Sequence, residues 1–379
     1  MNYFERNIGN QCIIVDGVEY TSNNYREIYE QNSCKGLCKG IYKGLVNFLD
    51  EWFNDSETIL VHTSGSTGEP KPFYVEKKRM IESACRTLSF LGINKGDSAL
   101  LCMNLDYIAG KMMVVRSLVA SLNLIVVEPC GNPIKELNAH IDFAAMIPLQ
   151  IYNSLSDLKQ REKLMSIPKI IIGGGAIDNI LLESIKGFPN QIWSTYGMTE
   201  TLSHIALRML NGSKASLWYT PLNGVKVRKN YDSVLVVNDM VTCDKELVTN
   251  DICEVNDNGE FLILGRRDNI INTGGIKVQI EELEDKLRNF INIPYMITSV
   301  KDIKFGEAIV MLINESDVCK DVVSNNKVCN DAEIISICKS NLKKYEIPKY
   351  IIKVDELPYT KNGKPDRYRA REIAGELIS

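Results

Sequence analysis

The chain contains 379 residues with a formal net charge of −4, and 45% of them are hydrophobic and 24% charged. This composition is typical of a globular protein that is long enough for two domains. The mild negative charge and scattered lysines argue against a nucleic-acid partner, and the lack of an apolar run of about 18 residues argues against a membrane span.

The first half of the chain alternates helical and strand patterns. Residues 1–55 are predicted to be helical in part, because apolar side chains fall three or four residues apart between Leu37 and Trp52. The run Ile59–Val61 predicts a buried strand, and Lys77–Leu91 predicts an amphipathic helix. Further strands are predicted at 99–105, 123–127 and 169–172, with a helix at 111–122. This alternation predicts a mostly parallel sheet covered by helices.

The pattern changes twice toward the C-terminus. Residues 217–265 contain short strand patterns at Val234–Val237 and Phe261–Leu264, separated by the turn residues Asp257–Gly259. They predict a small antiparallel subdomain. After Gly265, helix faces and strands mix in a compact α+β unit of about 110 residues, a typical size for a small domain.

A hydroxyl-rich loop follows the strand predicted at Ile59–Val61. Its hydroxyl, glycine and lysine residues are Thr63, Ser64, Gly65, Ser66, Thr67, Gly68 and Lys71. Hydroxyls, freely turning glycine amides and one ammonium group suit a phosphate, and strand, glycine-rich loop and helix are a common phosphate-binding order. A Walker loop does not fit, because the glycines are three residues apart and Pro72 follows the lysine. A serine- and glycine-rich surface turn is the alternative.

Four further motifs follow along the chain. They are Gly173-Gly174-Gly175; Ser194-Thr195-Tyr196-Gly197-Met198-Thr199-Glu200-Thr201; Gly265-Arg266-Arg267-Asp268 continuing through Gly274-Gly275-Ile276-Lys277 to Glu284; and Leu357-Pro358-Tyr359-Thr360-Lys361-Asn362-Gly363-Lys364. Each has an ordinary explanation when taken alone. Glu200 fits a solvated or capping charge, Tyr196 a core residue, Asp251 a turn and Lys364 a surface turn. Only their joint order overturns those explanations.

Together the five motifs, spread from residue 63 to residue 364, resemble the adenylate-forming superfamily of acyl-CoA synthetases, luciferases and adenylation domains. The resemblance implies an α/β fold with a large N-terminal AMP-binding domain, residues 1–267, of helix-covered, mostly parallel sheets plus a small antiparallel subdomain. It also implies a small mobile α+β lid, residues 268–379, with its hinge at Asp268. Only 62 residues precede the loop, so part of the family's usual N-terminal domain is expected to be trimmed or absent.

The resemblance implies roles for residues of the large domain. The loop 63–71 holds the β- and γ-phosphates of ATP, Thr199 contacts the α-phosphate, and Glu200 helps to hold Mg²⁺, for which a carboxylate is a suitable ligand. Tyr196, followed by Gly197, stacks on adenine. The other implied nucleotide contacts are Gly173, Gly174 and Gly175 at the adenine, and Asp251 and Arg266 at the ribose.

Two faces of the lid are implied to serve two half-reactions. Lys364 bridges the entering carboxylate and the α-phosphate during adenylation. After the lid rotates, the segment with Gly274 and Gly275 approaches the pantetheine arm of coenzyme A. Lys277 stands where many relatives have arginine, so it supplies a charge without a bidentate fork.

Weaker signals concern the acid. Ile271–Val278 and the short N-terminal part most resemble o-succinylbenzoate–CoA ligases of menaquinone biosynthesis. Tyr107 and Gly110 lie where relatives place residues of the acyl pocket, although the usual aromatic–histidine pair is absent there. Lys111 or Arg116 is a cation for a second substrate carboxylate, and the alternative is a charge on a helix face.

The expected function is an ATP-dependent acid–CoA ligase that forms an acyl-adenylate and then an acyl-CoA, using ATP, Mg²⁺ and coenzyme A. The expected acid is o-succinylbenzoate. The alternatives are a ligase for another aryl or short-chain acid, an enzyme that loads a carrier protein, and a non-catalytic nucleotide-binding module. Eleven cysteines without a CxxC pair predict reduced thiols in a cytoplasmic protein, and three histidines without ligand spacing predict no zinc site. The oligomeric state is left open.

Overall fold

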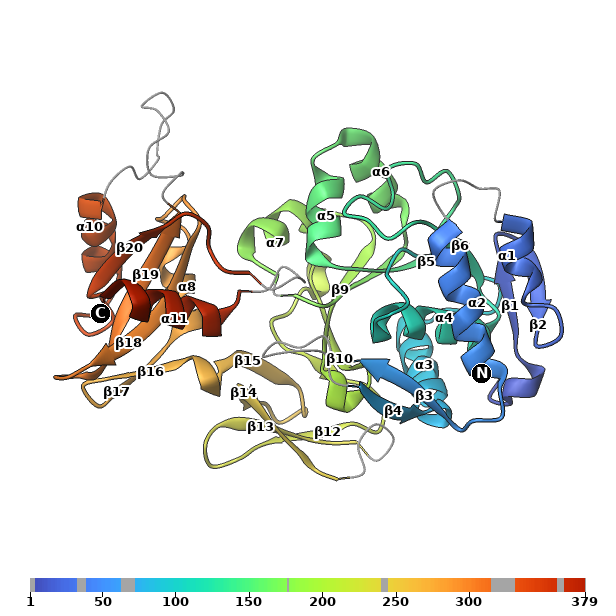
Figure 1. The fold of residues 1–379 in the computed structure, drawn as a ribbon, viewed down its shortest axis with the longest axis horizontal. Helices are drawn as coiled ribbons and strands as arrows, with labels where there is room; N and C mark the ends of the chain where they lie inside the picture. The colour runs from blue at the N-terminus through green and yellow to red at the C-terminus, as the bar shows by residue number, and fades with distance from the viewer. Residues whose placement is uncertain are drawn as a thin grey trace. The chain divides into compact units, whose positions relative to one another are not determined.

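The protein is described by a computed structural model, drawn as a ribbon in Figure 1, that covers residues 4–32, 39–62, 72–175, 177–239, 245–314, 331–359 and 365–378. The chain forms two compact units. Unit 1 comprises residues 1–227, 237–247 and 256–261, and unit 2 comprises residues 228–236, 248–255 and 262–379. The domain boundary after residue 267 and the hinge at Asp268 stay predictions. No helix among the described residues is long and apolar enough to cross a membrane.

Unit 1 contains a nine-stranded sheet. In order across the sheet, its strands are β11 (Thr220–Pro221), β10 (His204–Met209), β9 (Gln191–Gly197), β8 (Lys169–Ile172), β7 (Phe143–Met146), β5 (Ser98–Leu101), β6 (Asn123–Val126), β1 (Cys12–Val15) and β2 (Val18–Thr21). The strands from β9 to β1 run parallel, and antiparallel pairs flank them at both edges. The mostly parallel sheet predicted from the sequence is therefore confirmed.

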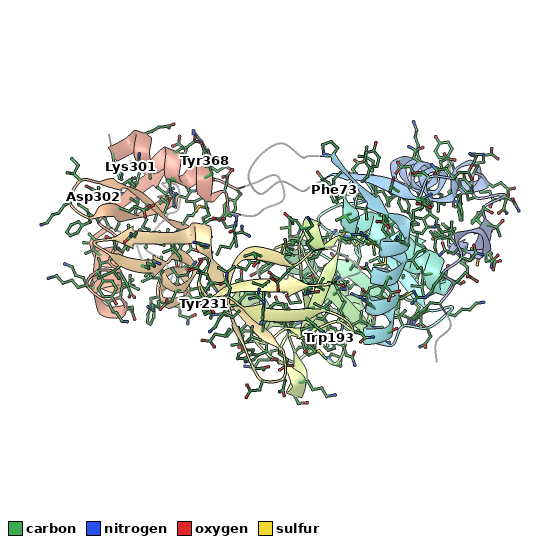
Figure 2. The ribbon with its side chains drawn as sticks, turned by 90° about the horizontal axis from the view of Figure 1, so that it is seen from below. Phe73, Trp193, Tyr231, Lys301, Asp302 and Tyr368 are labelled. Carbon is green, nitrogen blue, oxygen red and sulfur yellow. The ribbon has the colours of Figure 1, made fainter. Side chains whose placement is uncertain are left out.

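Helices of unit 1 bury the apolar strands. They are α1 (Glu27–Asn32), α2 (Lys39–Phe53), α3 (Lys77–Leu91), α4 (Ile108–Ala120), α5 (Pro148–Leu155), α6 (Leu158–Ser166) and α7 (Asn179–Ile185), besides the short 3₁₀ turn η1 (Ile8–Asn10). Ile151 of α5, Leu164 of α6 and Leu181 of α7 share one apolar core with β5, β7, β8 and β9. Phe90 of α3 packs edge-on against Trp193 of β9, with ring centroids 5.2 Å apart. Trp193 is labelled in Figure 2.

Two hairpins were missed by the sequence prediction. The β1–β2 hairpin turns at Asp16 and Gly17, which both have positive φ angles, of 49° and 87°. An Asp-Gly pair between apolar runs is a strong hairpin signal. The second hairpin pairs β3 (Thr58–His62) with β4 (Pro72–Glu76), so a strand separates the hydroxyl-rich loop from helix α3. Only one of the five β4 residues, Val75, is buried, so the sequence lacks the apolar pattern of a buried strand here.

A four-stranded sheet has residues in both units. It consists of β12 (Lys226–Lys229), β13 (Val234–Asn238), β14 (Leu247–Val255) and β15 (Phe261–Arg266), in that order. Short turns join β12 to β13 and β14 to β15, closed by bonds such as Asn230 N to Val234 O and Asn256 N to Glu260 O. Connections this short join antiparallel neighbours, as the sequence predicted for this region.

The rest of unit 2 is an α+β domain. A sheet in the order β17 (Ile276–Gln279), β16 (Ile270–Thr273), β19 (Gly306–Asn314), β18 (Tyr295–Asp302) also carries β20 (Tyr350–Val354), which pairs with β19. Helices α8 (Ile280–Leu287) and α10 (Asp331–Asn341) share an apolar core with this sheet, and α11 (Arg367–Ile378) contributes to a second one. The compact α+β unit expected after Gly265 is present.

An ion pair fastens α11 to α8 and β18. Both guanidinium nitrogens of Arg367 lie 2.6 Å from the two carboxylate oxygens of Glu284. The same carboxylate accepts the Ile297 N–H of β18 at 2.9 Å, and Arg367 also donates to the Ile297 carbonyl. The bidentate geometry satisfies most of the hydrogen-bonding capacity of both half-buried charges.

Removing this carboxylate should destabilise unit 2. In Glu284→Ala the guanidinium of Arg367 loses its partner while it stays half-buried, so we expect a loss of about 2–3 kcal/mol in the free energy of unfolding. The matched control is Glu372→Ala, which removes an exposed partner of Arg369 and should cost less than about 1 kcal/mol. Urea denaturation followed by circular dichroism measures both, and equal losses would contradict the role of the pair.

Candidate functional site

The carboxyl ends of neighbouring parallel strands form the frame of the site. Strands β5, β7, β8 and β9 end at Leu101, Met146, Ile172 and Gly197. Strand β6 pairs with one side of β5 and β7 with the other, so the order of the strands reverses at β5. In open α/β sheets ligands bind outside the carboxyl ends at such a reversal. The segments predicted to bind nucleotide and acid in unit 1 directly follow β5, β8 and β9.

The glycine segment after β8 lies beside β9. Gly173 N–H donates to the carbonyl of Met146 at 3.1 Å, and the Thr195 hydroxyl donates to the carbonyl of Ile172 at 3.2 Å. A Cβ on Gly173 would lie 2.6 Å from the Thr195 hydroxyl oxygen. Gly174 has a φ of 79° and is exposed together with Gly175. The segment thus offers bare backbone at the sheet edge, which suits the close approach of a flat ring.

Tyr196 belongs to a cluster of three aromatic rings. Its ring lies 5.0 Å from Phe261 in an edge-on arrangement and 5.7 Å from Tyr219. Tyr219 and Phe261 stack on each other at 5.5 Å and exchange two backbone hydrogen bonds. The Tyr219 hydroxyl is also 2.9 Å from that of Ser194. This packing fixes the half-buried ring of Tyr196, on which adenine is expected to stack.

Gly197 is required by a close backbone contact. A bulge in the pairing of β9 with β10 sets Gly197 opposite His204. A Cβ on Gly197 would lie 2.5 Å from both the Cα of His204 and the carbonyl oxygen of Ser203. Real side chains do not tolerate this distance, so only glycine fits here.

Glu200 fits the expected metal contact by its chemistry. It lies in a 3₁₀ turn at Thr199–Thr201, and its carboxylate is exposed. Its side chain makes no hydrogen bond or ion pair with another described residue, and an unengaged carboxylate oxygen is a suitable ligand for Mg²⁺. The backbone of Thr199 is described, but its side chain lies outside the described part.

The acyl-pocket residues surround the start of α4. Tyr107 caps the helix with 41% of its surface exposed, and a Cβ on Gly110 would lie 2.5 Å from the carbonyl oxygen of Asn104. Lys111 is buried, and its ammonium group donates to the carbonyl of Leu60 at 3.0 Å and lies 3.4 Å from Glu51. Lys111 therefore ties α4 to strand β3, which leads into the hydroxyl-rich loop.

Arg116 is the other cation considered for a second carboxylate. Its side chain is buried, with 2% of the residue exposed, so it is not a charge on a solvated helix face. Its Nη2 donates to the Ser203 hydroxyl at 3.3 Å, while its buried Nε has no partner among the described atoms. Burial lowers the pKa of Arg116 to about 10, which leaves it charged at neutral pH.

Asp251, Arg266 and Asp268 are joined within unit 2. Arg266 lies 3.4 Å from the buried carboxylate of Asp251 and 3.2 Å from Asp268. Asn250 also donates to Asp268 at 3.2 Å, and the Asp251 N–H donates to the Thr249 hydroxyl. A carboxylate that is held in this way can accept hydrogen bonds from a diol.

The glycine pair predicted to meet coenzyme A forms the turn of the β16–β17 hairpin. Gly274 and Gly275 have φ angles of 61° and 82°, a conformation that glycine adopts without strain. The Gly274 N–H donates to the Phe305 carbonyl at 2.7 Å. Lys277 is exposed on β17, opposite Asn272.

Two predicted parts of the site lie outside the described residues. They are the loop residues Thr63, Ser64, Gly65, Ser66, Thr67, Gly68 and Lys71, and the lid residue Lys364. The strands that flank the loop are paired up to His62 and Pro72. The roles of all these site residues stay predictions.

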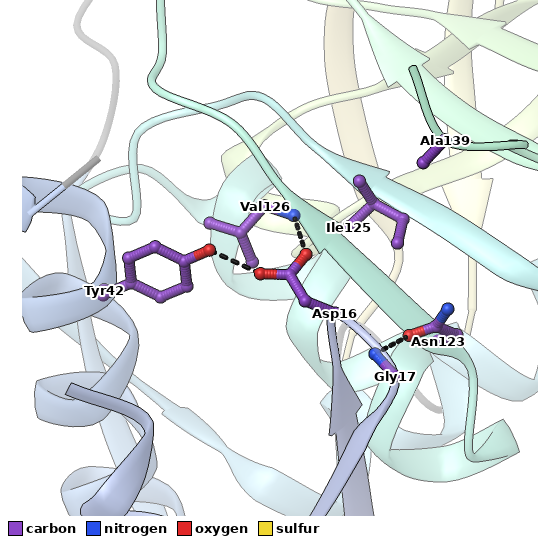
Figure 3. A pocket seen from close by; sticks show the side chains of 7 residues that line it. All are labelled: Asp16, Gly17, Tyr42, Asn123, Ile125, Val126 and Ala139. Atoms are coloured by element: carbon purple, nitrogen blue, oxygen red, sulfur yellow. Dashed lines mark hydrogen bonds between the residues drawn. The ribbon is translucent and has the colours of Figure 1, made fainter. Parts of the chain in front are cut away.

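A separate hollow of about 430 Å³ lies at the β1–β6 side of unit 1 (Figure 3). Its polar groups mainly bind one another: the Tyr42 hydroxyl donates to Asp16 at 2.5 Å, and the Gly17 N–H donates to Asn123 at 2.9 Å. These bonds hold the β1–β2 turn against β6. The hollow contains none of the predicted site residues.

Four residues beside the site were missed by the sequence prediction: Thr87, Tyr219, Phe261 and His204. Tyr219 and Phe261 pair across an isolated bridge, and neither residue is part of a motif. His204 lies shortly after the end of the motif at Thr201, but a single histidine without ligand spacing gives no signal in the sequence. Thr87 lies within α3. The sequence does not distinguish it from any other polar residue of a helix, because its contacts depend on how the helix packs.

The contact at Gly197 allows a direct test. Gly197→Ala should lower the free energy of unfolding by about 1–3 kcal/mol, as overpacking does, and weaken ATP binding about tenfold because the β9–β10 connection must shift. The control is Gly187→Ala, since a Cβ there meets nothing within 4 Å. Calorimetric ATP titration and urea denaturation measure both effects. An alanine variant at residue 197 that behaves like the control would refute the contact.

Comparison with known proteins agrees with this geometry. The model of the AMP-binding enzyme family matches residues 17–240. A 2-succinylbenzoate–CoA ligase of Geobacillus sp. is 25% identical over 351 residues, which cover 85% of this chain and 70% of the relative. The structure of an acyl-CoA synthetase (AMP-forming)/AMP-acid ligase II-like protein from Dyadobacter fermentans is 30% identical, with a TM-score of 0.58 over 88% of this chain and 94% of that one.

A further solved structure shows the same fold. It is o-succinylbenzoate CoA synthetase (MenE) from Bacillus subtilis in complex with the acyl-adenylate intermediate OSB-AMP, with a TM-score of 0.71, 18% identity and coverage of 95% of each chain. The resemblance noted in the sequence is thereby confirmed. This chain belongs to the AMP-binding enzyme family.

Proposed function

We propose that this protein is an ATP-dependent acid–CoA ligase whose acid is o-succinylbenzoate, acting in menaquinone biosynthesis. The similarity to 2-succinylbenzoate–CoA ligases over 85% of the chain supports this proposal, as do the groups brought together in each unit. With ATP and coenzyme A as substrates, we place the protein in the cytoplasm. A different aryl or short-chain acid, or a carrier-protein thiol as acceptor, would appear as an outcome of the experiment below.

The reaction joins a carboxylate to AMP before the thiol attacks. A carboxylate oxygen of the acid attacks the α-phosphorus of ATP, and pyrophosphate leaves. The thiol of coenzyme A then attacks the acyl carbon, AMP leaves, and a thioester forms. Both steps place negative charge on phosphate oxygens, so catalysis is mainly positioning and electrostatic stabilisation.

The described residues fit the two halves of the nucleotide. Tyr196 and the exposed backbone of Gly174 suit adenine, and the Asp251 carboxylate suits the ribose hydroxyls. Glu200 presents an exposed carboxylate for Mg²⁺, which would neutralise charge on the phosphates when bound. The exposed turn at Gly274 and Gly275 suits the pantetheine arm.

The observation that carries the choice of acid is the buried charge of Arg116. Its guanidinium has no carboxylate partner among the described residues, and its Nε has no hydrogen-bond partner there. An unpaired buried charge is costly, so a site that retains one is expected to receive an anion. The contact with Ser203 places this charge next to the connection from Tyr196 to Thr201. An acid with a second carboxylate meets that requirement, and o-succinylbenzoate has one.

A screen of acids tests the proposed function. Pyrophosphate release is measured with ATP and a panel of carboxylic acids, with and without coenzyme A, and thioester products are identified by mass spectrometry. We expect o-succinylbenzoate to give the highest kcat/KM and to require coenzyme A for a thioester. Preference for another acid would overturn the choice of substrate. No release with any acid would favour a nucleotide-binding module.

A buried anion partner predicts a specific effect of Arg116→Met. The variant should raise the KM for o-succinylbenzoate about 30-fold or more, because a charge-assisted bond to a buried carboxylate is lost. For 3-benzoylpropionate, which lacks the ring carboxylate, the change should be small. Arg161→Met, at an exposed arginine of α6, is the control. An equal change for both acids would contradict the role of Arg116.

The role proposed for Lys364 predicts that its substitution slows adenylation much more than thioester formation. In Lys364→Ala, pyrophosphate release should fall by about 10²–10³-fold or more, as expected for a lost transition-state donor. Thioester formation from a supplied o-succinylbenzoyl-adenylate should be largely retained. Single-turnover measurements of each half-reaction test this, and equal damage to both would contradict two separate lid faces.

A further inference from the structure

His204 lies beside Arg116 in a position that the proposed reaction does not yet use. It is the first residue of β10, and its Cα presses against Gly197. Ser203, which accepts a hydrogen bond from Arg116, directly precedes it. The half-buried imidazole therefore borders both the nucleotide motif and the buried guanidinium.

The hydrogen bonds of Thr87 determine which nitrogen of His204 carries the proton. The Thr87 hydroxyl is completely buried and donates its single proton to the Ser83 carbonyl at 3.1 Å. The same oxygen lies 2.9 Å from Nε2 of His204. Since the hydroxyl proton is already used, Nε2 must be the donor in this contact. The neutral ring thus keeps its lone pair on Nδ1.

The hydrogen bond that the ring of His204 forms with a described residue is the one with Thr87 at Nε2, so Nδ1 has no hydrogen-bond partner among the described residues. Burial and the neighbouring charge of Arg116 hold the pKa of His204 well below its ordinary value, so the imidazole is neutral at pH 7. On α3, the adjacent Arg86 is paired with Asp239 at 2.9 Å. Burial is thus the larger cause of the lowered pKa of His204, and Arg116 of α4 is the neighbouring charge that lowers it further.

We propose that Arg116 and His204 together recognise the second carboxylate of the acid, and that Nδ1 of His204 takes up a proton from solvent when this carboxylate binds. The inference rests on the proposed function. A neutral Nδ1 is an acceptor and repels a carboxylate oxygen, whereas a protonated Nδ1 donates to it. The bound carboxylate also offsets the positive field of Arg116, which after burial is the second cause of the lowered pKa of His204.

The sign of the pH dependence follows from this coupling. The pKa of His204 is lower in the free protein than in the complex, so binding is accompanied by proton uptake between the two pKa values. The affinity for o-succinylbenzoate should fall as the pH rises through the pKa of the complex, by up to about tenfold per unit. Both carboxylates of the acid are already ionised at pH 7, and Arg116 is charged throughout, so neither contributes protons.

Isothermal titration calorimetry measures the protons directly. The protein is saturated with α,β-methylene-ATP, which blocks adenylation, and o-succinylbenzoate is titrated at pH 7 in phosphate and in Tris. The difference in enthalpy between these buffers gives the protons taken up. We expect up to about one proton per site for o-succinylbenzoate and none for 3-benzoylpropionate.

Variants separate His204 from other groups. His204→Gln keeps an amide donor for Thr87 but cannot titrate, so proton uptake should vanish while binding persists with a flatter pH dependence. His140→Gln is the matched control, because His140 is an exposed histidine paired with Asp142, and its uptake should equal that of the wild type. A change in folding alone would not alter the proton count of a variant that still binds.

The outcomes distinguish the two proposals. Binding of o-succinylbenzoate without proton uptake, or uptake that persists in His204→Gln, would overturn the role of His204 and leave the proposed function standing. Absence of binding for both acids, together with no thioester in the acid screen, would overturn the proposed function and this inference with it.

Discussion

The parallel pairing of β5, β7, β8 and β9 is the constraint on which the candidate site of unit 1 depends. Because these strands share a direction and end at similar levels, their carboxyl ends bring together segments that are far apart in the sequence. The glycine segment, the Tyr196 motif and the start of α4 meet at one edge for this reason. Local contacts such as the Thr195 bond to Ile172 then fix the spacing.

Much of this arrangement could be predicted from the sequence. The helix predicted at Lys77–Leu91 matches α3 residue for residue, and the alternation of strands and helices correctly indicated a parallel sheet. Motif order identified the family, because a fixed succession of short motifs depends little on overall identity. The β1–β2 hairpin could also have been predicted from its Asp16-Gly17 turn. Strand β4 could not, because only one of its five residues, Val75, is buried.

The polar surroundings of the acid could not be predicted in this way. In the sequence, Lys111 and Arg116 look alike, because each is a positive charge within a predicted helix. In the structure, Lys111 donates to the Leu60 carbonyl, whereas the Nε of Arg116 has no hydrogen-bond partner among the described residues. Their difference arises from what packs against α4, which is tertiary information. The same holds for His204, whose tautomer depends on a hydroxyl of α3 that lies 117 residues away in the sequence. Unpartnered polar groups of this kind can be identified only once the positions of the helices are known.

Helix α4 is buried along its whole length from Gly110 to Ala120, and this limits how the protein can be redesigned. A residue that is enclosed on all sides contributes to packing as well as to recognition, so exchanging Arg116 for a different shape alters the core together with the acid preference. Tyr107, at the beginning of the same helix, is 41% exposed. Engineering toward new acids would therefore begin more safely at the cap of α4 than at its centre.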